Sequence, residues 1–119
     1  MKQPGPDHPI TITREAQRVR VQFGGKTVVD TTRALKLQEA NFPPVYYVPR
    51  VDADMALLTK TAHGTHCPYK GDASYFTISA DGRAADNAVW SYETPYPAVA
   101  EIKEYLAFYP NRVDAIKVG

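Results

Sequence analysis

Residues 73–92 read ASYFTISADGRAADNAVWSY, and this stretch decides the fold class of the chain. Apolar and polar residues alternate in Ala73–Ser79, which is the period of a half-buried strand. Asp81 and Gly82 then favour the positive φ angles of a tight turn, and Ala88–Tyr92 follows as the returning strand. The stretch predicts an antiparallel hairpin in a fold built mainly from strands.

A second hairpin is predicted on the N-terminal side of this stretch. Ile10–Ile12 and Arg18–Phe23 alternate in the same way. The two glycines at 24 and 25 suit a two-residue hairpin loop, so Lys26–Val29 is expected to return as its second strand.

Two more strands are predicted, together with one segment of uncertain type. Val45–Val48 is a strand that ends at proline on both sides, and Val113–Val118 is a candidate for the last strand. Ala34–Leu37 is too short to assign. A charged loop is expected at 50–54, and the polar residues 62–71 predict a second loop.

The sequence predicts one helix, at about residues 97–106. Pro97 suits a first helical position, and Val99, Ile102 and Leu106 repeat at the three- and four-residue spacing of a helix face. Residues 1–8 are rich in proline, glycine and charge and are expected to form a flexible lead-in to a single domain at residues 9–119. The predicted class is therefore mainly β, of the α+β type, with one C-terminal helix.

Composition excludes several classes of protein. Fourteen basic and thirteen acidic residues give a net charge of +1, with no basic run to follow a phosphate backbone, so we expect no nucleic-acid partner. No apolar stretch approaches the roughly 18 residues of a membrane span, and we expect no membrane partner. The single cysteine closes no internal disulfide, which favours the cytoplasm.

Reactive side chains are concentrated at residues 63–72, HGTHCPYKGD. Cys67 is a candidate nucleophile, because a neighbouring Lys70 or protonated His66 would lower its thiol pKa. The alternative for Cys67 is structural, since unpaired cysteine is among the most buried residue types. Lys70 is a candidate for holding an anion or attacking a carbonyl, and otherwise a solvated loop lysine.

Aromatic and basic residues nearby extend this candidate site. Tyrosines and the tryptophan on predicted strands either line a pocket or fill the core, and Arg50 either clamps an anionic ligand or forms a structural ion pair. The predicted ligand-binding residues are Tyr47, Arg50, Tyr69, Gly71, Tyr75, Trp90 and Tyr92. The predicted catalytic residues are Cys67 as nucleophile, Lys70 as its electrostatic partner and His66 as acid or base.

Metal binding is weakly supported. Adjacent ligands such as His66 and Cys67 rarely converge on one ion, so a set built from His63, His66 and Cys67 does not match zinc-site spacing. Asp52 and Asp54 form the sort of carboxylate pair that holds magnesium in nucleotide-transferring enzymes, but such pairs are common in polar loops. The sequence predicts no metal site and identifies no cofactor or oligomeric state.

Four runs of residues together resemble the domain of unknown function 427 (DUF427) family. They are YYVPRVD at 46–52, CPYKGDASY at 67–75, AVWSY at 88–92 and AFY at 107–109. The resemblance covers nearly the whole chain and implies a compact, strongly bent antiparallel fold of the β-tent type with one helix, in which two of the motif runs, CPYKG at 67–71 and WSY at 90–92, border one cleft. A nucleotidyltransferase label is attached to the family, which has no established reaction.

Three functions remain open from the sequence. The leading hypothesis is a cleft that binds or transforms a small-molecule ligand around Cys67 and Lys70. The second is a non-enzymatic interaction or accessory domain, in which the prolines, Gly71 and the tyrosines only fix the backbone. The third is magnesium-dependent nucleotide transfer through Asp52 and Asp54.

Overall fold

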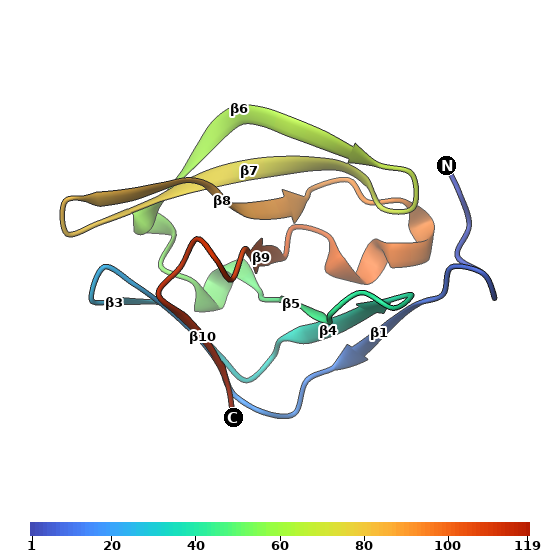
Figure 1. The fold of residues 1–119 in the computed structure, drawn as a ribbon, viewed down its shortest axis with the longest axis horizontal. Coiled ribbons are helices and arrows are strands. Elements are labelled where there is room, and N and C mark those ends of the chain that lie inside the picture. Colours follow the sequence, from blue (N-terminus) through green and yellow to red (C-terminus); the bar gives the residue numbers. More distant parts are fainter.

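The computed structural model describes residues 1–119 and contains ten strands, three 3₁₀ segments and no α-helix (Figure 1). The strands are β1 (Ile10–Arg14), β2 (Val19–Phe23), β3 (Lys26–Thr31), β4 (Leu35–Glu39), β5 (Val45–Tyr47), β6 (Leu58–Cys67), β7 (Gly71–Ala80), β8 (Arg83–Tyr92), β9 (Leu106–Phe108) and β10 (Ala115–Val118). The 3₁₀ segments are η1 (Arg50–Asp52), η2 (Met55–Leu57) and η3 (Pro97–Ile102). None of these segments has the length and apolar character needed to cross a membrane.

All strand pairs are antiparallel, and they form three sheets. The largest sheet has the order β6-β7-β8-β9, and the two smaller sheets have the orders β1-β4-β5 and β10-β2-β3. In Figure 1 the large sheet spans the upper part of the molecule, and the two small sheets lie below it. The predicted mainly-β, antiparallel class is confirmed.

The β7-β8 hairpin confirms the prediction from residues 73–92 and extends it at both ends. Asp81 and Gly82 have φ angles of 52° and 75°, as a two-residue hairpin turn requires. The register places Tyr75 opposite Trp90 and shifts between Phe76 and Ile78. β8 begins at Arg83 rather than at the predicted Ala88.

The other predicted strands are also present. Gly24 and Gly25 have φ angles of 57° and 75° and connect β2 to β3, while β10 pairs with the opposite edge of β2. The unassigned segment at 34–37 becomes β4, the central strand between β1 and β5. A two-residue bridge between Val48 and Leu106 joins the β5 end of this small sheet to β9.

The predicted C-terminal helix is wrong. Pro97 does begin a helical segment, but η3 is of the 3₁₀ type, and Val99 interrupts it with φ −125° and ψ 28°. The three apolar residues of the predicted helix face are fully buried, namely Val99, Ile102 and Leu106. Their spacing therefore indicated burial correctly, although not a helix. Backbone pairing overrode the helix period, because Leu106 belongs to β9 and exchanges hydrogen bonds with Val48.

The predicted loop at residues 62–71 is also wrong, because most of it is the second half of β6. This strand lies at the edge of the large sheet, and most of its residues from Thr59 to His66 are exposed. An edge strand with two solvated faces needs no apolar alternation, so its polar sequence resembles a loop. Only Pro68, Tyr69 and Lys70 form the turn into β7.

The β2-β3 turn generates a stability test. A Cβ atom on Gly24 would lie 2.8 Å from the carbonyl oxygen of Ala80, whereas one on Gly25 would meet open space. Both glycines have positive φ, so alanine strains the backbone at each position by about 1 kcal/mol. We expect Gly24→Ala to lower the free energy of unfolding by about 3 kcal/mol, because the clash with Ala80 adds to that strain.

Urea unfolding of Gly24→Ala and of the matched control Gly25→Ala measures the difference. Equal losses in the two variants would show that the turn does not pack against Ala80 in solution.

Candidate functional site

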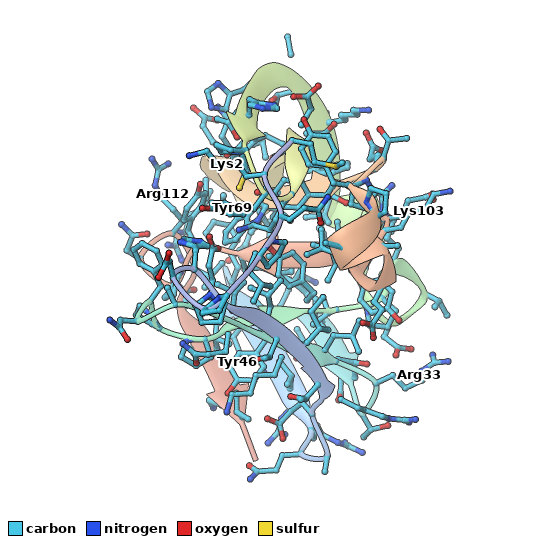
Figure 2. All side chains as sticks on the ribbon, turned by 90° about the vertical axis from the view of Figure 1, so that its right-hand side faces the viewer. Lys2, Arg33, Tyr46, Tyr69, Lys103 and Arg112 are labelled. Carbon is cyan, nitrogen blue, oxygen red and sulfur yellow. The ribbon has the colours of Figure 1, made fainter.

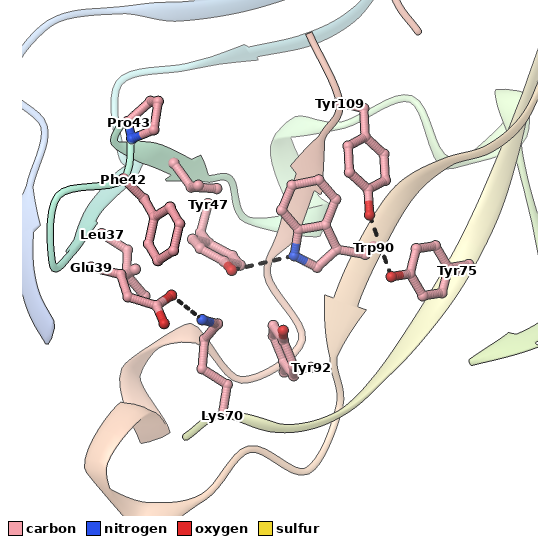
Figure 3. Close-up of a pocket in the computed structure, with 11 residues that line it drawn as sticks. Leu37, Glu39, Phe42, Pro43, Tyr47, Lys70, Tyr75, Trp90, Tyr92 and Tyr109 are labelled. Atoms are coloured by element: carbon pink, nitrogen blue, oxygen red, sulfur yellow. Dashed lines mark hydrogen bonds and ion pairs between the residues drawn. The ribbon is translucent and has the colours of Figure 1, made fainter. Parts of the chain in front are cut away.

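A cavity of about 400 Å³ lies between the β1-β4-β5 sheet and the large sheet (Figure 3). Its volume falls in the range of roughly 300–1,000 Å³ that is typical of small-molecule sites. Its eleven lining residues, eight of them hydrophobic, are Leu37, Glu39, Phe42, Pro43, Val45, Tyr47, Lys70, Tyr75, Trp90, Tyr92 and Tyr109. They come from both sheets and from the loop that joins β4 to β5.

The side chains of the cavity walls point inwards because alternate residues of a strand share one face. Trp90 and Tyr92 are two residues apart on β8 and therefore point to the same face, and Tyr75 is the cross-strand partner of Trp90 on β7. Leu37 and Glu39 are likewise two residues apart on β4. Each sheet thus turns an apolar face towards the other, and the cavity occupies the space between these faces.

Hydrogen bonds hold most of the aromatic rings in place. The indole Nε1 of Trp90 donates to the hydroxyl of Tyr47 over 3.3 Å, and the Trp90 and Tyr109 ring centres are 4.5 Å apart. The hydroxyl of Tyr75 lies 2.9 Å from Thr65 Oγ1 and 3.4 Å from the Tyr109 hydroxyl. These contacts fix the shape of the cavity before any ligand arrives.

Tyr92 differs from the other tyrosines of the cavity. Its side chain is buried, yet its hydroxyl has no hydrogen-bond partner in the protein. Burial raises the pKa of Tyr92 and of Tyr47, and burial together with the contact to Tyr75 raises the pKa of Tyr109 to about 12. All three hydroxyls therefore keep their protons at neutral pH and remain able to donate hydrogen bonds.

Lys70 and Glu39 form an ion pair at the polar end of the cavity. The side chain of Lys70 is about 10% exposed, and its ammonium group donates to Glu39 Oε1. His8 Nε2 donates to Glu39 Oε2 over 2.7 Å. Burial would raise the pKa of Glu39, but the hydrogen bonds from Lys70 and His8 hold it below its ordinary value. The positive charge of Lys70 and the negative charge of Glu39 offset each other. Two N–H groups of the Lys70 ammonium have no acceptor in the protein.

The N-terminal segment contacts this end of the cavity. The ring of His8 stacks on Tyr69 with the ring centres 4.0 Å apart, and the backbone N–H of Lys2 donates to the carbonyl oxygen of Pro68. Lys2 and Tyr69 lie close together in Figure 2, with the ammonium nitrogen 5.9 Å from the ring centre. Tyr69, predicted to bind ligand, instead faces residues of its own chain.

The structure brings together five of the ten predicted site residues in this cavity, namely Tyr47, Lys70, Tyr75, Trp90 and Tyr92. It does not place Cys67 or His66 in the lining. Cys67 is half-buried and packs against the core cluster that includes the cavity residues Tyr47 and Tyr92. His66 is the preceding residue of the same strand and points to the opposite face, where its Nδ1 bonds to Asp72 over 2.7 Å.

Arg50 and Gly71 also lie outside the lining. The guanidinium of Arg50 donates to the carbonyl oxygen of Glu104, to Ser91 Oγ and to a carboxylate oxygen of Glu93. Ser91 follows Trp90 on β8 and so faces away from the cavity. Gly71 has φ 106°, which a residue with a side chain rarely adopts, and it turns the chain from Lys70 into β7.

Sequence reasoning missed Glu39 and Tyr109. Glu39 ends a strand whose face also carries Leu35 and Leu37, and a carboxylate on an apolar face is the signal that was available. Tyr109 comes directly after β9, and the sequence analysis includes it only as the end of the AFY run, without a place in the site.

Asp52, one of the two aspartates considered for magnesium binding, has other side-chain partners. Asp52 accepts hydrogen bonds from Thr31 and, through both carboxylate oxygens, from Arg33. No three His, Cys, Asp or Glu side chains gather closely enough to hold a metal ion.

One comparison with known proteins gives a match. The sequence family described as domain of unknown function (DUF427) matches residues 11–119, which include every residue of the cavity. No curated protein matches the chain.

The buried ion pair generates a pH test. Glu39 has a lower pKa in the folded chain than its ordinary value of 4.5, so its charged form stabilises the fold. That contribution is complete above pH 4.5 and is lost as the pH falls through the folded-state pKa. We expect Glu39→Gln to lower the free energy of unfolding by about 2 kcal/mol at pH 7, with the difference vanishing at low pH.

Urea unfolding at several pH values between 7 and 3 measures this, with the exposed Glu101→Gln as the matched control. A constant gap between Glu39→Gln and the unsubstituted protein at every pH would rule out the charge of Glu39 as its origin.

Proposed function

We propose a ligand-binding function for this chain, which belongs to the DUF427 family. The proposed ligand is a small, flat, uncharged molecule that carries a carbonyl group, and it binds in the cavity beside Lys70. One observation carries the proposal: the Tyr92 hydroxyl and two Lys70 N–H groups lie at a largely apolar cavity and have no acceptor in the protein. The carbonyl oxygen of a ligand would accept from these donors in place of water.

The shape of the ligand follows from the walls. Tyr47, Tyr75 and Trp90 present rings from both sides, and Phe42 adds a ring at the rim that is 60% exposed. Aromatic walls favour flat ligands, because stacked and edge-to-face contacts need a planar partner. The volume of about 400 Å³ suits a molecule with one or two rings.

The charge of the ligand follows from the Lys70–Glu39 pair. A phosphate or carboxylate would meet a lysine whose charge Glu39 already offsets, at a site largely removed from water. Arg50, the other cation predicted to clamp an anion, is bound to Glu93 on the far side of the sheet. An uncharged acceptor avoids the repulsion that an anionic ligand would meet from the carboxylate of Glu39.

A different ion pair speaks against nucleotide transfer, since Asp52 is paired with Arg33.

Reversible binding is favoured over covalent catalysis. A nucleophilic Cys67 needs a base within hydrogen-bonding distance, and its neighbour His66 points to the other face of β6 and bonds to Asp72. The Nζ atom of Lys70 is engaged in an ion pair with the carboxylate of Glu39. The cavity therefore has groups that orient a carbonyl and no nearby pair that would attack one.

We expect Tyr92→Phe to separate stability from binding. The hydroxyl has no partner in the protein, so its removal should leave the free energy of unfolding unchanged within about 0.5 kcal/mol. The affinity for a carbonyl ligand should fall about fivefold to tenfold, as for the loss of one hydrogen bond. The measurement is a thermal-shift screen with benzamide, nicotinamide and methyl benzoate, followed by calorimetric titration of any hit.

Tyr96→Phe is the matched control, because Tyr96 is a partly buried tyrosine outside the cavity. A ligand at 100 times its dissociation constant adds about 2.7 kcal/mol, which is several degrees in melting temperature. Equal affinity in Tyr92→Phe would place the ligand elsewhere. A silent screen across uncharged and anionic probes would favour the interaction or accessory domain instead.

We expect Cys67→Ala to retain the affinity of the ligand found in this screen within about twofold. Cys67 does not line the cavity, so its loss removes no ligand contact. Calorimetric titration measures the affinity, and mass spectrometry of the unsubstituted protein incubated with the same ligand detects any adduct. A covalent adduct on Cys67 would contradict reversible binding.

A further inference from the structure

The N-terminal segment, residues 1–9, is bonded to both sides of the ion pair at the polar end of the cavity. The backbone N–H of Ala40, which directly follows the glutamate of that pair, donates to the carbonyl oxygen of Pro9 over 2.8 Å. The backbone N–H of Lys2 donates over 2.8 Å to Pro68, in the turn that ends with the lysine of the pair. The segment therefore connects the end of β4 to the turn before β7.

The side chain of His8 makes the same connection at shorter range. Its Nε2 donates to Glu39 Oε2 over 2.7 Å, and its ring stacks on Tyr69 with 7° between the ring planes. Tyr69 is the chain neighbour of Lys70, whose ammonium group donates to the other carboxylate oxygen of Glu39. These contacts close a ring that runs from His8 through Glu39, Lys70 and Tyr69 back to His8.

The position of His8 is fixed by its own backbone. Its N–H donates to the carbonyl oxygen of Gly5 over 3.0 Å, and the N–H of Gly5 donates to the carbonyl oxygen of His8 over 3.3 Å. The side chains of His8 and Glu39 are 25% and 18% exposed. A hydrogen bond between groups that are already held in place loses less side-chain entropy than one between two free side chains.

The bond from His8 decides how Glu39 uses Lys70. A carboxylate accepts through both oxygens, and His8 is the protein donor to Oε2. Without it, Oε2 would be free to accept a second N–H from the Lys70 ammonium, which already donates to Oε1. That second bond would consume one of the two N–H groups that remain for the carbonyl oxygen of a ligand.

We infer that His8 is a positioning residue of the ligand site: by occupying Glu39 Oε2, it keeps two N–H groups of Lys70 free for the ligand carbonyl. This inference rests on the proposed function and adds the N-terminal segment to its site. The DUF427 match begins at residue 11, so His8 lies outside the matched part of the chain. Ligand affinity in this chain therefore depends on a residue that the family match does not include.

Two substitutions separate the hydrogen bond of His8 from its ring. Glutamine carries its amide nitrogen as many bonds from the backbone as Nε2 of histidine, so His8→Gln retains a donor to Glu39 and loses the stacked ring. Asparagine is one bond shorter, so His8→Asn loses both and is the matched comparison.

Calorimetric titration with benzamide measures the consequence for binding. We expect His8→Asn to weaken benzamide binding about fivefold to tenfold and His8→Gln to stay within about twofold of the unsubstituted protein. A purely structural role for His8 would lower the melting temperature in both variants and leave the two affinities equal.

The titration of the Glu39 carboxyl gives a readout that needs no ligand. Burial raises the pKa of Glu39, and the hydrogen bonds from Lys70 and then from His8 lower it below its ordinary value. NMR of the Glu39 carboxyl should therefore report a higher pKa in His8→Asn than in the unsubstituted protein. The rise should be smaller in His8→Gln, because glutamine keeps the hydrogen bond.

The outcomes separate this inference from the proposed function. If benzamide does not bind but the Glu39 pKa follows the two variants, the proposed ligand is wrong and the link from His8 to the cavity is supported. The inference is overturned if the Glu39 pKa is the same in all three proteins. It is also overturned if His8→Asn binds benzamide as tightly as His8→Gln does.

Discussion

The backbone pairing of Val48 with Leu106 holds the β1-β4-β5 sheet against the larger sheet, and the rest of the structure depends on it. Each residue donates to the carbonyl oxygen of the other over 2.8 Å, and both are buried. Leu37 and Tyr47 stand on one side of this connection, and Tyr75 and Trp90 on the other. If the two sheets separated, the walls of the cavity would no longer face each other.

The ion pair of Lys70 with Glu39 makes a second connection between the same two sheets. It links the turn before β7 to the end of β4, at the one polar end of an apolar cavity. A buried pair gains little net stability, because both charges lose water, but it leaves few alternative arrangements of the groups around it. This chain thus places an oriented, charge-neutral set of donors next to aromatic rings, and the proposed function rests on that set.

The candidate site was predictable in part. The tyrosines, Trp90 and Lys70 were found because aromatic residues on strands and a lysine beside glycine are visible signals in the sequence. Cys67 and His66 appeared to act together because they are adjacent, yet adjacent residues of a strand point to opposite faces. Glu39 was missed because its partner, Lys70, is 31 residues away along the chain. For Arg50 the sequence left a ligand clamp and a structural ion pair open, and its partners on β8 and after η3 are equally distant along the chain.

The sequence by itself determined the antiparallel, mainly-β class and both hairpins, because alternation and glycine-containing turns are local properties of the backbone. Only the tertiary structure decided that residues 58–67 form an edge strand. It also decided that Leu106, which the spacing predicts as a helix residue, belongs to β9. Both outcomes depend on hydrogen bonds to strands distant in sequence, which local spacing does not report. The cavity was likewise decided at this level, since it is enclosed by side chains from separate sheets and exists only once those sheets have packed.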